Sequence, residues 1–257
     1  MSLTVDLNAD MGESFGPWVM GQDAAILDVI TSANIACGFH AGDPDVMATT
    51  MTLARDKGVG IGAHPGFQDL QGFGRRRITL PDATLANLVR YQVGASLGMA
   101  RSLGAQVRHI KLHGAMSNMA SEDQHMARVC YDAAMSVAPE AIIMVLAGTA
   151  QERAVRELGC AWAGEIFADR AYNDDATLVD RAKPGAVIHD PTQASRRVVE
   201  MVKAGAIIAE SGTRIDANID TICLHGDTPT ALGIARSVRS ELEAAGVGLK
   251  VFGDRRG

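Results

Sequence analysis

Residues 4–10 read TVDLNAD, and this short stretch decides the fold. Side chains alternate between the two faces of a β-strand, so the polar residues Asp6, Asn8 and Asp10 share one face and the apolar residues between them share the other. A strand of an ordinary parallel sheet is covered on both faces and reads as a nearly unbroken apolar run. A strand with one polar face is therefore exceptional, and its polar residues are candidates for a functional site.

Runs of β-branched or apolar residues recur along the rest of the chain, separated by segments with helical periodicity. The expected strands cover residues 4–9, 33–37, 58–63, 107–112, 141–147, 161–168 and 220–224, with a further one at 247–252. The expected helices cover residues 43–57, 80–103, 122–137, 150–158, 193–204 and 229–245. Asp43 is the expected N-cap of the first of these, with Pro44 at its first position. The alternation, without a linker or a change of composition, predicts one α/β domain over residues 1–257, and about seven strand–helix units favour a closed (β/α) barrel over an open sheet.

Polar side chains recur at the carboxyl ends of several expected strands. The set comprises His40, His64, His109, Lys111, His113, Glu165, Asp169 and His225. In a (β/α) barrel the loops that follow the strands converge at this end, and the active site lies there. The pattern therefore predicts that these residues come together in one site, although a single histidine at a strand end is more often structural.

Several of these residues allow two interpretations. Asp6 either orients the first strand or takes part in the chemistry. Lys111 is either a buried cation paired with a carboxylate, for which Asp6 or Glu165 is available, or a group that holds a substrate carboxylate. The basic loop at residues 72–77, GFGRRR, either binds an anion or is a solvated run of charge.

Composition excludes several classes of protein. The 257 residues include 47% hydrophobic and 21% charged residues, which is ordinary for a globular chain. The net charge of −6 argues against a nucleic-acid partner, and the longest apolar run, near residues 141–148, is too short to span a membrane. Four cysteines without a CxxC pair and an N-terminus without an apolar leader predict reduced thiols in a cytoplasmic protein.

Longer motifs identify a family resemblance that covers essentially the whole chain. The motifs are DLNADMGESFGPW at 6–18, SANIACGFHAGDP at 32–44, IGAHPGFQD at 61–69, GFGRR at 72–76, FADRAYNDDATLVDR at 167–181, GAVIHD at 185–190 and TICLHGDTP at 221–229. They resemble the LamB/YcsF family, which comprises the A subunit of the prokaryotic ATP-dependent 5-oxoprolinase. The resemblance implies a distorted (β/α) TIM-like barrel related to carbohydrate deacetylases. It also implies hydrolysis of 5-oxo-L-proline (pyroglutamate) to L-glutamate, with ATP giving ADP and phosphate, in a complex with the B and C subunits.

The chain departs from the family pattern at two places. The fourth motif, usually KPHGALYN, reads KLHGAMSN at residues 111–118, which removes a Pro and a Tyr, and the stretch after Tyr172 lacks the usual Pro-Asp-Gly turn. Against the related deacetylases, Asp10 resembles the metal-binding Asp and His64 the first metal-binding His, but Gln68 stands where the second His is expected. A deacetylase-like metal site is therefore complete only if His40 contributes from the neighbouring loop.

The resemblance and the reaction chemistry together assign expected roles. Ring opening of a γ-lactam needs a base for water, donors for the developing charge and an acid for the departing amine. The expected catalytic residues are Asp10, His113 and Asp169; the expected substrate-binding residues are Asn8, Asp43, Arg75, Arg76, Lys111 and His225; the expected ligands of a divalent metal are Asp10, His40 and His64. No Walker-type phosphate loop occurs in the sequence, so we expect ATP to be bound largely by the partner subunits.

Two other functions remain as alternatives. One is a metal-dependent, carbohydrate deacetylase-like hydrolase that acts alone, and the other is a non-catalytic subunit that binds substrate for its partners. Assembly of the chain into a homo-oligomer is a further open alternative. The loop at residues 169–190, rich in Asp and Arg, is either a lid, a hairpin or a partner surface.

Overall fold

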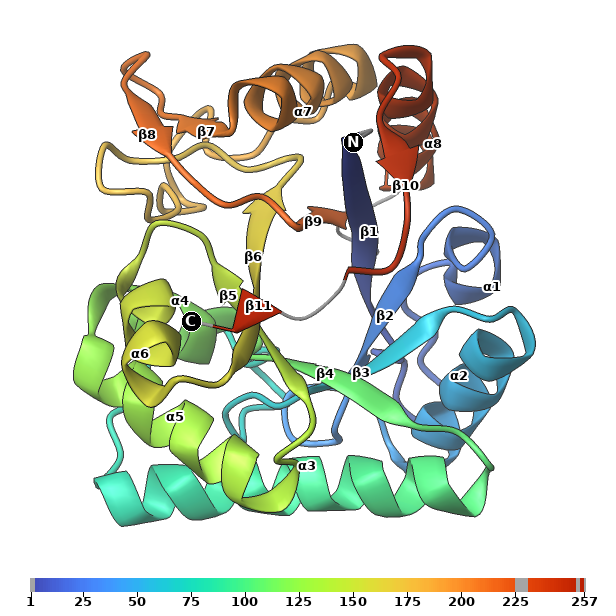
Figure 1. Ribbon diagram of the computed structural model, residues 1–257. Helices are drawn as coiled ribbons and strands as arrows, with labels where there is room; N and C mark the ends of the chain where they lie inside the picture. Colours follow the sequence, from blue (N-terminus) through green and yellow to red (C-terminus); the bar gives the residue numbers. More distant parts are fainter. Residues whose placement is uncertain (1–2, 225–230, 253–254, 257) are drawn as a thin grey trace.

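The computed structural model describes residues 3–224, 231–252 and 255–256, and its elements are labelled in Figure 1. The strands are β1 Thr4–Met11, β2 Ser32–Ala36, β3 Gly60–His64, β4 Val107–Lys111, β5 Ile142–Leu146, β6 Ala161–Phe167, β7 Ala206–Ile208, β8 Arg214–Asp216, β9 Thr221–Leu224, β10 Gly248–Leu249 and β11 Arg255–Arg256. The helices are α1 Asp23–Ile26, α2 Pro44–Asp56, α3 Asp82–Ser102, α4 Gly114–Glu122, α5 Gln124–Val137, α6 Ala150–Leu158, α7 Pro191–Ala204 and α8 Ala231–Ala244.

Seven parallel strands close into a barrel in the order β1-β2-β3-β4-β5-β6-β9. Closure is made by β9, which pairs with β6 on one side and with β1 on the other. Ala9 of β1 thus has Ala33 of β2 as one neighbour and Leu224 of β9 as the other. Helices surround the strands, as Figure 1 shows for α2, α3, α5 and α6. The predicted (β/α) barrel is confirmed.

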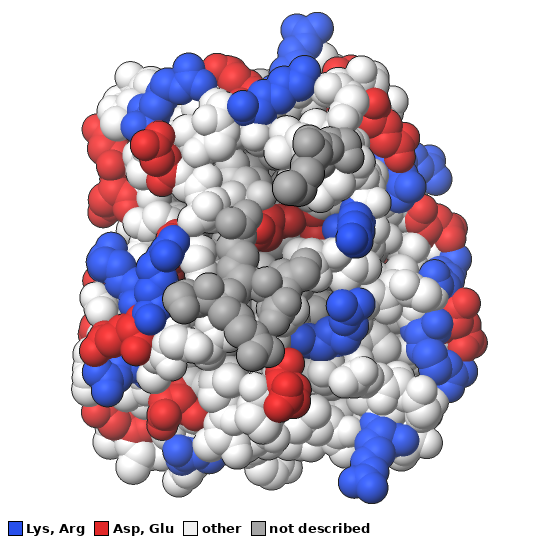
Figure 2. Space-filling model, in the orientation of Figure 1, with Lys and Arg blue, Asp and Glu red and all other residues white. Residues whose placement is uncertain are grey.

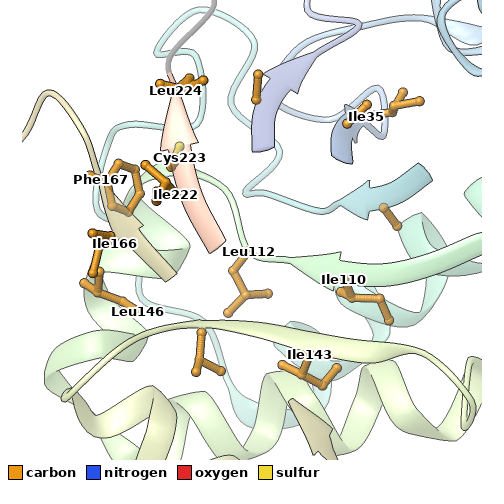
Figure 3. Close-up of a cluster of buried hydrophobic side chains, with 14 of the residues drawn as sticks. Ile35, Ile110, Leu112, Ile143, Leu146, Ile166, Phe167, Ile222, Cys223 and Leu224 are labelled. Atoms are coloured by element: carbon orange, nitrogen blue, oxygen red, sulfur yellow. The ribbon is translucent and has the colours of Figure 1, made fainter. Parts of the chain in front are cut away.

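The two faces of the strands differ as the first strand predicts. Apolar side chains on the outer face pack against the helices, and Figure 3 shows Ile110, Ile143, Ile166 and Ile222 from four consecutive barrel strands. The inner face is polar over much of its length. Asp6 lies on the inner face near the amino end of β1. Its carboxylate accepts hydrogen bonds from the hydroxyls of Thr31, Ser32 and Thr221 at 2.5, 2.7 and 2.5 Å. Of its two interpretations, the structure therefore supports the orienting role for Asp6.

Helix boundaries follow capping signals in the sequence. Asp43 caps α2 as predicted, since its side chain accepts from the backbone N–H groups of Asp45 and Val46, both at 2.9 Å. Helix α6 has the predicted bounds, and α5 starts after its own N-cap, Asp123. Prediction missed α4, because its nine residues begin with Gly and include Ser and Asn, which are poor helix formers. Packing of buried residues such as Met116 stabilises this short helix instead.

Two segments near the carboxyl end of the chain differ from expectation. The strand expected at 247–252 is reduced to the two residues of β10, because β10 pairs only with Thr4 and Val5 of β1. From Leu7 onward that edge of β1 is taken by β2 and the residue before it, since the N–H of Thr31 donates to the carbonyl of Leu7. The short antiparallel hairpin of β7 and β8 was not predicted, and it stands apart from the barrel.

Charged side chains of both signs are mixed on the surface. On the face shown in Figure 2, Lys and Arg alternate with Asp and Glu and form no broad basic patch. Among the described residues, no helix is long and apolar enough to cross a membrane.

Candidate active site

A cavity of about 610 Å³ opens at the carboxyl ends of β1, β3, β4 and β6. Its lining includes carboxylates, imidazoles and several basic side chains. These are Asp10, Glu13, His64, Arg75, Arg77, Lys111, His113, Glu122, Arg170, Asp180, Arg181 and Lys183. The predicted convergence of polar residues at this end of the barrel is therefore present in the structure.

Four buried residues at this end form what we call the imidazole cluster, namely Glu13, His40, His64 and His113. Their ligating atoms all lie within 4.8 Å of one another. The rings of His40 and His113 stack with centroids 3.6 Å apart, and Nε2 of His64 lies 3.0 Å from Nδ1 of His113. Both ring nitrogens of His40 are buried and have no hydrogen-bond partner among the described residues. The cluster is thus a compact set of nitrogen and oxygen donors.

Two glycines make room for the stacked rings. Gly74 has φ of +62°, and a Cβ there would lie 2.7 Å from Cβ of His40 and 2.8 Å from Cδ2 of His113. A Cβ on Gly66 would lie 2.7 Å from Nδ1 of His40. Between these glycines Phe73 adopts a φ of 53°, and its carbonyl accepts a hydrogen bond from Nε2 of His113 at 2.8 Å. The Gly-rich motifs therefore shape the space for the histidines.

Lys111 lies deeper in the barrel than the imidazole cluster, between the carboxylates of Asp10 and Glu165. Its ammonium group is 2.9 Å from Asp10 and 2.8 Å from Glu165, with Asn8 at 3.3 Å and the Cys223 sulfur at 3.1 Å. Burial opposes its charge, but these carboxylates together raise the pKa of Lys111 well above its usual value. The structure thus realises the paired-cation interpretation of Lys111, with Asp10 and Glu165 rather than Asp6 as partners.

Burial also sets the charge of the histidines. It lowers the pKa of His40 and of His113 well below 6.5, and the neighbouring imidazole rings lower both pKa values further. Both rings are therefore neutral at pH 7. Neutral imidazole is the form that ligates metals and accepts protons.

The loop between β6 and α7 forms one wall of the cavity. Residues 177–183 line it, and the buried Arg170 holds them by donating to the carbonyl of Val179 at 2.6 Å. Arg197 of α7 in turn donates to the carbonyl of Arg170 at 2.8 Å. Antiparallel bridges join Arg170 to Val187 and Tyr172 to Leu178, so of the three interpretations of this loop the structure supports a hairpin, and this hairpin lies against the cavity.

The structure brings most of the predicted site residues together. Asp10, Arg75, Lys111 and His113 line the cavity, as does His64, and His40 lies behind them in the imidazole cluster. Nε2 of His64 is 3.4 Å from Oδ2 of Asp10, so all three expected metal ligands lie at this end of the barrel.

Other predicted residues lie elsewhere. Asn8 is buried inside the barrel, where it donates to Thr221 at 2.7 Å. Asp43 caps α2 and also accepts from the N–H of Gly16 at 2.7 Å. Arg76 forms an ion pair with Asp69, and neither it nor Asp169, which is buried, is among the residues that line the cavity. His225 lies outside the described residues.

Sequence reasoning missed Glu13. It is buried, lines the cavity and lies 4.0 Å from Nδ1 of His113. The alternation of β1 gives no signal for it, because Gly12 ends the strand period with a φ of +67°. Its only sequence signal is its place in the motif at 6–18. Gln68, at the position of a second deacetylase-type His, is exposed and lies outside the cavity lining.

Comparisons with known proteins agree with this geometry. The LamB/YcsF family model matches residues 5–256. The A subunit of 5-oxoprolinase from Ruegeria pomeroyi is 70% identical over 248 residues, which cover 96% of this chain and 98% of that one. The corresponding protein of Rhodopseudomonas palustris strain BisB18 is 52% identical over 97% of this chain and 98% of its own.

Solved structures show the same fold. The lactam utilization protein of Thermus thermophilus superposes with a TM-score of 0.91 at 40% identity, over 97% of this chain and all of that one. The catalytic domain of a peptidoglycan N-acetylglucosamine deacetylase from Eubacterium rectale has a TM-score of 0.53 at 10% identity, over 98% of this chain and 90% of that one. This second likeness concerns the barrel fold alone.

Proposed function

The chain belongs to the LamB/YcsF family, and from that premise we propose that it is the A subunit of a 5-oxoprolinase, a hydrolase that opens the cyclic amide of 5-oxo-L-proline to give L-glutamate. The observation that carries the proposal is the 70% identity, over nearly the full length of both chains, to a protein named as the A subunit of 5-oxoprolinase. The cavity supports it, because it combines carboxylates, neutral imidazoles and arginines as hydrolysis of an anionic lactam requires.

We further propose that the reaction is coupled to ATP hydrolysis in a complex with the B and C subunits. The relatives are named as one lettered subunit of their enzyme, which supports the existence of partners. The sequence has no Walker-type phosphate loop, so ATP is assigned to the partner subunits. Transfer of a phosphoryl group to the amide oxygen makes the ring carbonyl carbon electrophilic, and it prepares the ring for attack by water.

The residues of the cavity then have distinct tasks in ring opening. Asp10 or Glu13 takes a proton from water as its oxygen bonds to the phosphorylated carbonyl carbon and gives it to the ring nitrogen as the carbon–nitrogen bond breaks, while neutral His113 orients these groups. Ring opening leaves γ-glutamyl phosphate, and attack of a second water releases L-glutamate and phosphate from it. Arg75 binds the substrate carboxylate. The ammonium of Lys111 keeps Asp10 in place, because it already lies 2.9 Å from that carboxylate.

A divalent metal is proposed at the imidazole cluster, held by His64, His113, His40 and a carboxylate. The donor set suits Zn²⁺ and similar ions, and the unpartnered nitrogens of His40 are available as ligands. When bound, such an ion supplies a Lewis acid that lowers the pKa of water.

Two histidines of the cluster, His64 and His113, are each held by a backbone carbonyl on the ring nitrogen that points away from the other ring. Nδ1 of His64 lies 2.8 Å from the carbonyl of Lys111, and Nε2 of His113 lies 2.8 Å from the carbonyl of Phe73. A carbonyl only accepts, so each of these nitrogens carries a proton. The other two nitrogens face each other at 3.0 Å, and each can offer a lone pair to one cation placed between them. Backbone carbonyls orient metal-binding histidines in this way.

One assay tests the function. Oxoproline hydrolysis is measured with this chain alone and with added B and C subunits, with and without ATP and chelator. We expect turnover only with partners and ATP, and Asp10→Asn is expected to lower it by about 10²-fold or more. Activity of the chain alone on an N-acetyl sugar would instead support the deacetylase alternative. If Asp10→Asn and Glu13→Gln both turned over oxoproline at the wild-type rate, the result would instead support the alternative of a non-catalytic binding subunit.

Metal binding is tested separately from activity. Protein dialysed against Zn²⁺ or Co²⁺ is analysed for bound metal, and the Co²⁺ form is examined by visible absorption. We expect about one ion per chain, lost in His113→Ala but retained in His125→Ala, a histidine paired with Asp82 on the surface. Absence of bound metal in the wild type would contradict the metal proposal and leave the hydrolase proposal intact.

A further inference from the structure

Exposed large apolar side chains are concentrated on one loop of the described surface. Between β1 and α1, residues 15–20 read FGPWVM and include four of them: Phe15, Trp18, Val19 and Met20. Trp18 is 70% exposed and Val19 is 87% exposed. The others in the described residues, Leu3, Leu70 and Tyr91, do not follow one another along the chain. Single exposed apolar residues are common in soluble proteins, whereas a run of four is not. We call residues 15–20 the apolar loop.

The apolar loop has an ordered backbone. Phe15 and Trp18 exchange two backbone hydrogen bonds of 3.0 and 2.9 Å, and their rings stack with centroids 6.1 Å apart. The hydroxyl of Ser14 accepts from the N–H of Met20 at 2.9 Å, and the carboxylate of Asp43 accepts from Gly16. The loop therefore presents its side chains in a fixed arrangement, which reduces the entropy lost on binding.

Position and composition indicate what binds there. Glu13 lines the cavity two residues before the apolar loop begins, so the loop stands beside the mouth of the site. None of residues 15–20 is among the described residues that line the cavity, so the loop lies outside the wall of the proposed substrate site. Residues 15–22 carry no charged side chain. An exposed tryptophan among uncharged residues is typical of the centre of a protein–protein interface.

We infer that the apolar loop docks a partner subunit of the oxoprolinase complex through an apolar, uncharged surface at the mouth of the cavity. This inference rests on the proposed function, since relatives of the chain are named as subunits of a larger enzyme. Docking here would bring the partner next to Glu13 and close the cavity toward solvent. A ligand activated on the partner would then reach the carboxylates and imidazoles without crossing bulk water.

The test compares Trp18→Ala with a matched control. Full-length chains are titrated with the B and C subunits, and the dissociation constant is measured by calorimetry. Because truncation of a central tryptophan costs about 2 kcal/mol or more, Trp18→Ala is expected to weaken assembly by about 30-fold or more. Tyr91→Ala removes an aromatic side chain that is 66% exposed on α3, and it is expected to assemble as the wild type does. Val19→Asp provides a second variant, since it places a charge in the interface without removing a buried group.

The outcomes separate this inference from the proposed function. Wild-type affinity of both Trp18→Ala and Val19→Asp for the partners overturns the docking surface. Self-association of the chain that is lost in Trp18→Ala, with partner binding unchanged, assigns the loop to a second copy and also overturns it. If the wild type binds the B and C subunits but does not hydrolyse oxoproline, the proposed function fails while the docking result stands.

Discussion

The ammonium of Lys111 lies 2.8 Å from the carboxylate of Glu165 inside the barrel, and both side chains are almost completely buried. A second carboxylate, that of Asp10, lies 2.9 Å from the same ammonium on the side of the cavity. The charge of Lys111 therefore links the interior of the barrel to the proposed catalytic carboxylate.

Removal of this charge is expected to destabilise the protein strongly. Lys111→Met leaves two carboxylates without their cation, so the free energy of unfolding in urea should fall by about 3–5 kcal/mol. The double variant Lys111→Met/Glu165→Gln should recover part of this loss. Arg128→Met, which breaks an exposed pair with Glu157, should cost less than about 1 kcal/mol. Strictly additive effects of the two buried substitutions would contradict the coupling.

Gly74 is expected to be essential for the arrangement of the imidazole cluster. Gly74→Ala and Gly205→Ala both place a side chain at a φ near +60°, which costs about 1–2 kcal/mol. Only at Gly74 does the added Cβ meet His40 and His113, since no atom of the described part of the chain lies within 4 Å of a Cβ at Gly205. We therefore expect Gly74→Ala, and not Gly205→Ala, to abolish metal binding and oxoproline turnover in the assembled enzyme. Equal activity of the two variants would exclude this role.

Asp6 is expected to make stability depend on pH. Burial raises the pKa of Asp6 from 3.8 to about 6, although three hydroxyl groups oppose the shift by hydrogen bonding. The folded protein thus holds this proton more tightly than the unfolded chain does. Its contribution is fully present below pH 3.8 and is lost as the pH rises through about 6, with an amplitude of about 3 kcal/mol. The measurement is the free energy of urea unfolding of the wild type and of Asp6→Asn between pH 4 and 7. As the pH rises, the wild type should lose stability relative to Asp6→Asn. A difference that does not change with pH would contradict the raised pKa.

The four cysteines are expected to be unreactive in the folded protein. All four are buried and free, and burial raises the pKa of Cys37 to about 11 and that of Cys130 to about 12. Because the thiolate is the reacting form, a thiol reagent such as DTNB should modify no cysteine at pH 8 until denaturant is added. Rapid labelling of one thiol in the native protein would show that its surroundings are more open than the structure indicates.

Part of the site could be predicted because it follows from local periodicity. Asp10, Lys111 and His113 lie at positions whose orientation is fixed by the two-residue period of a strand and by the common direction of parallel strands. Arg75 and Arg76 are adjacent in the same basic loop, so the sequence does not distinguish them. Arg76 nevertheless pairs with Asp69 outside the cavity. Glu13 follows a glycine with a positive φ, which ends the two-residue alternation of the strand. The alternation therefore does not predict the direction of the Glu13 side chain. Loops lack a repeat that would tell which way a side chain points.

The sequence by itself determined the barrel, the polar interior and the end at which the site lies, because alternation of strands and helices and of side-chain faces are properties of short segments. Its motifs also determined the family. Tertiary structure alone decided that β9 closes the ring, that Lys111 pairs with Asp10 and Glu165, and that Glu13 joins three histidines in one cluster. These contacts join residues that are far apart in the chain, and their distances depend on how the strands close and on how the loops fold over them.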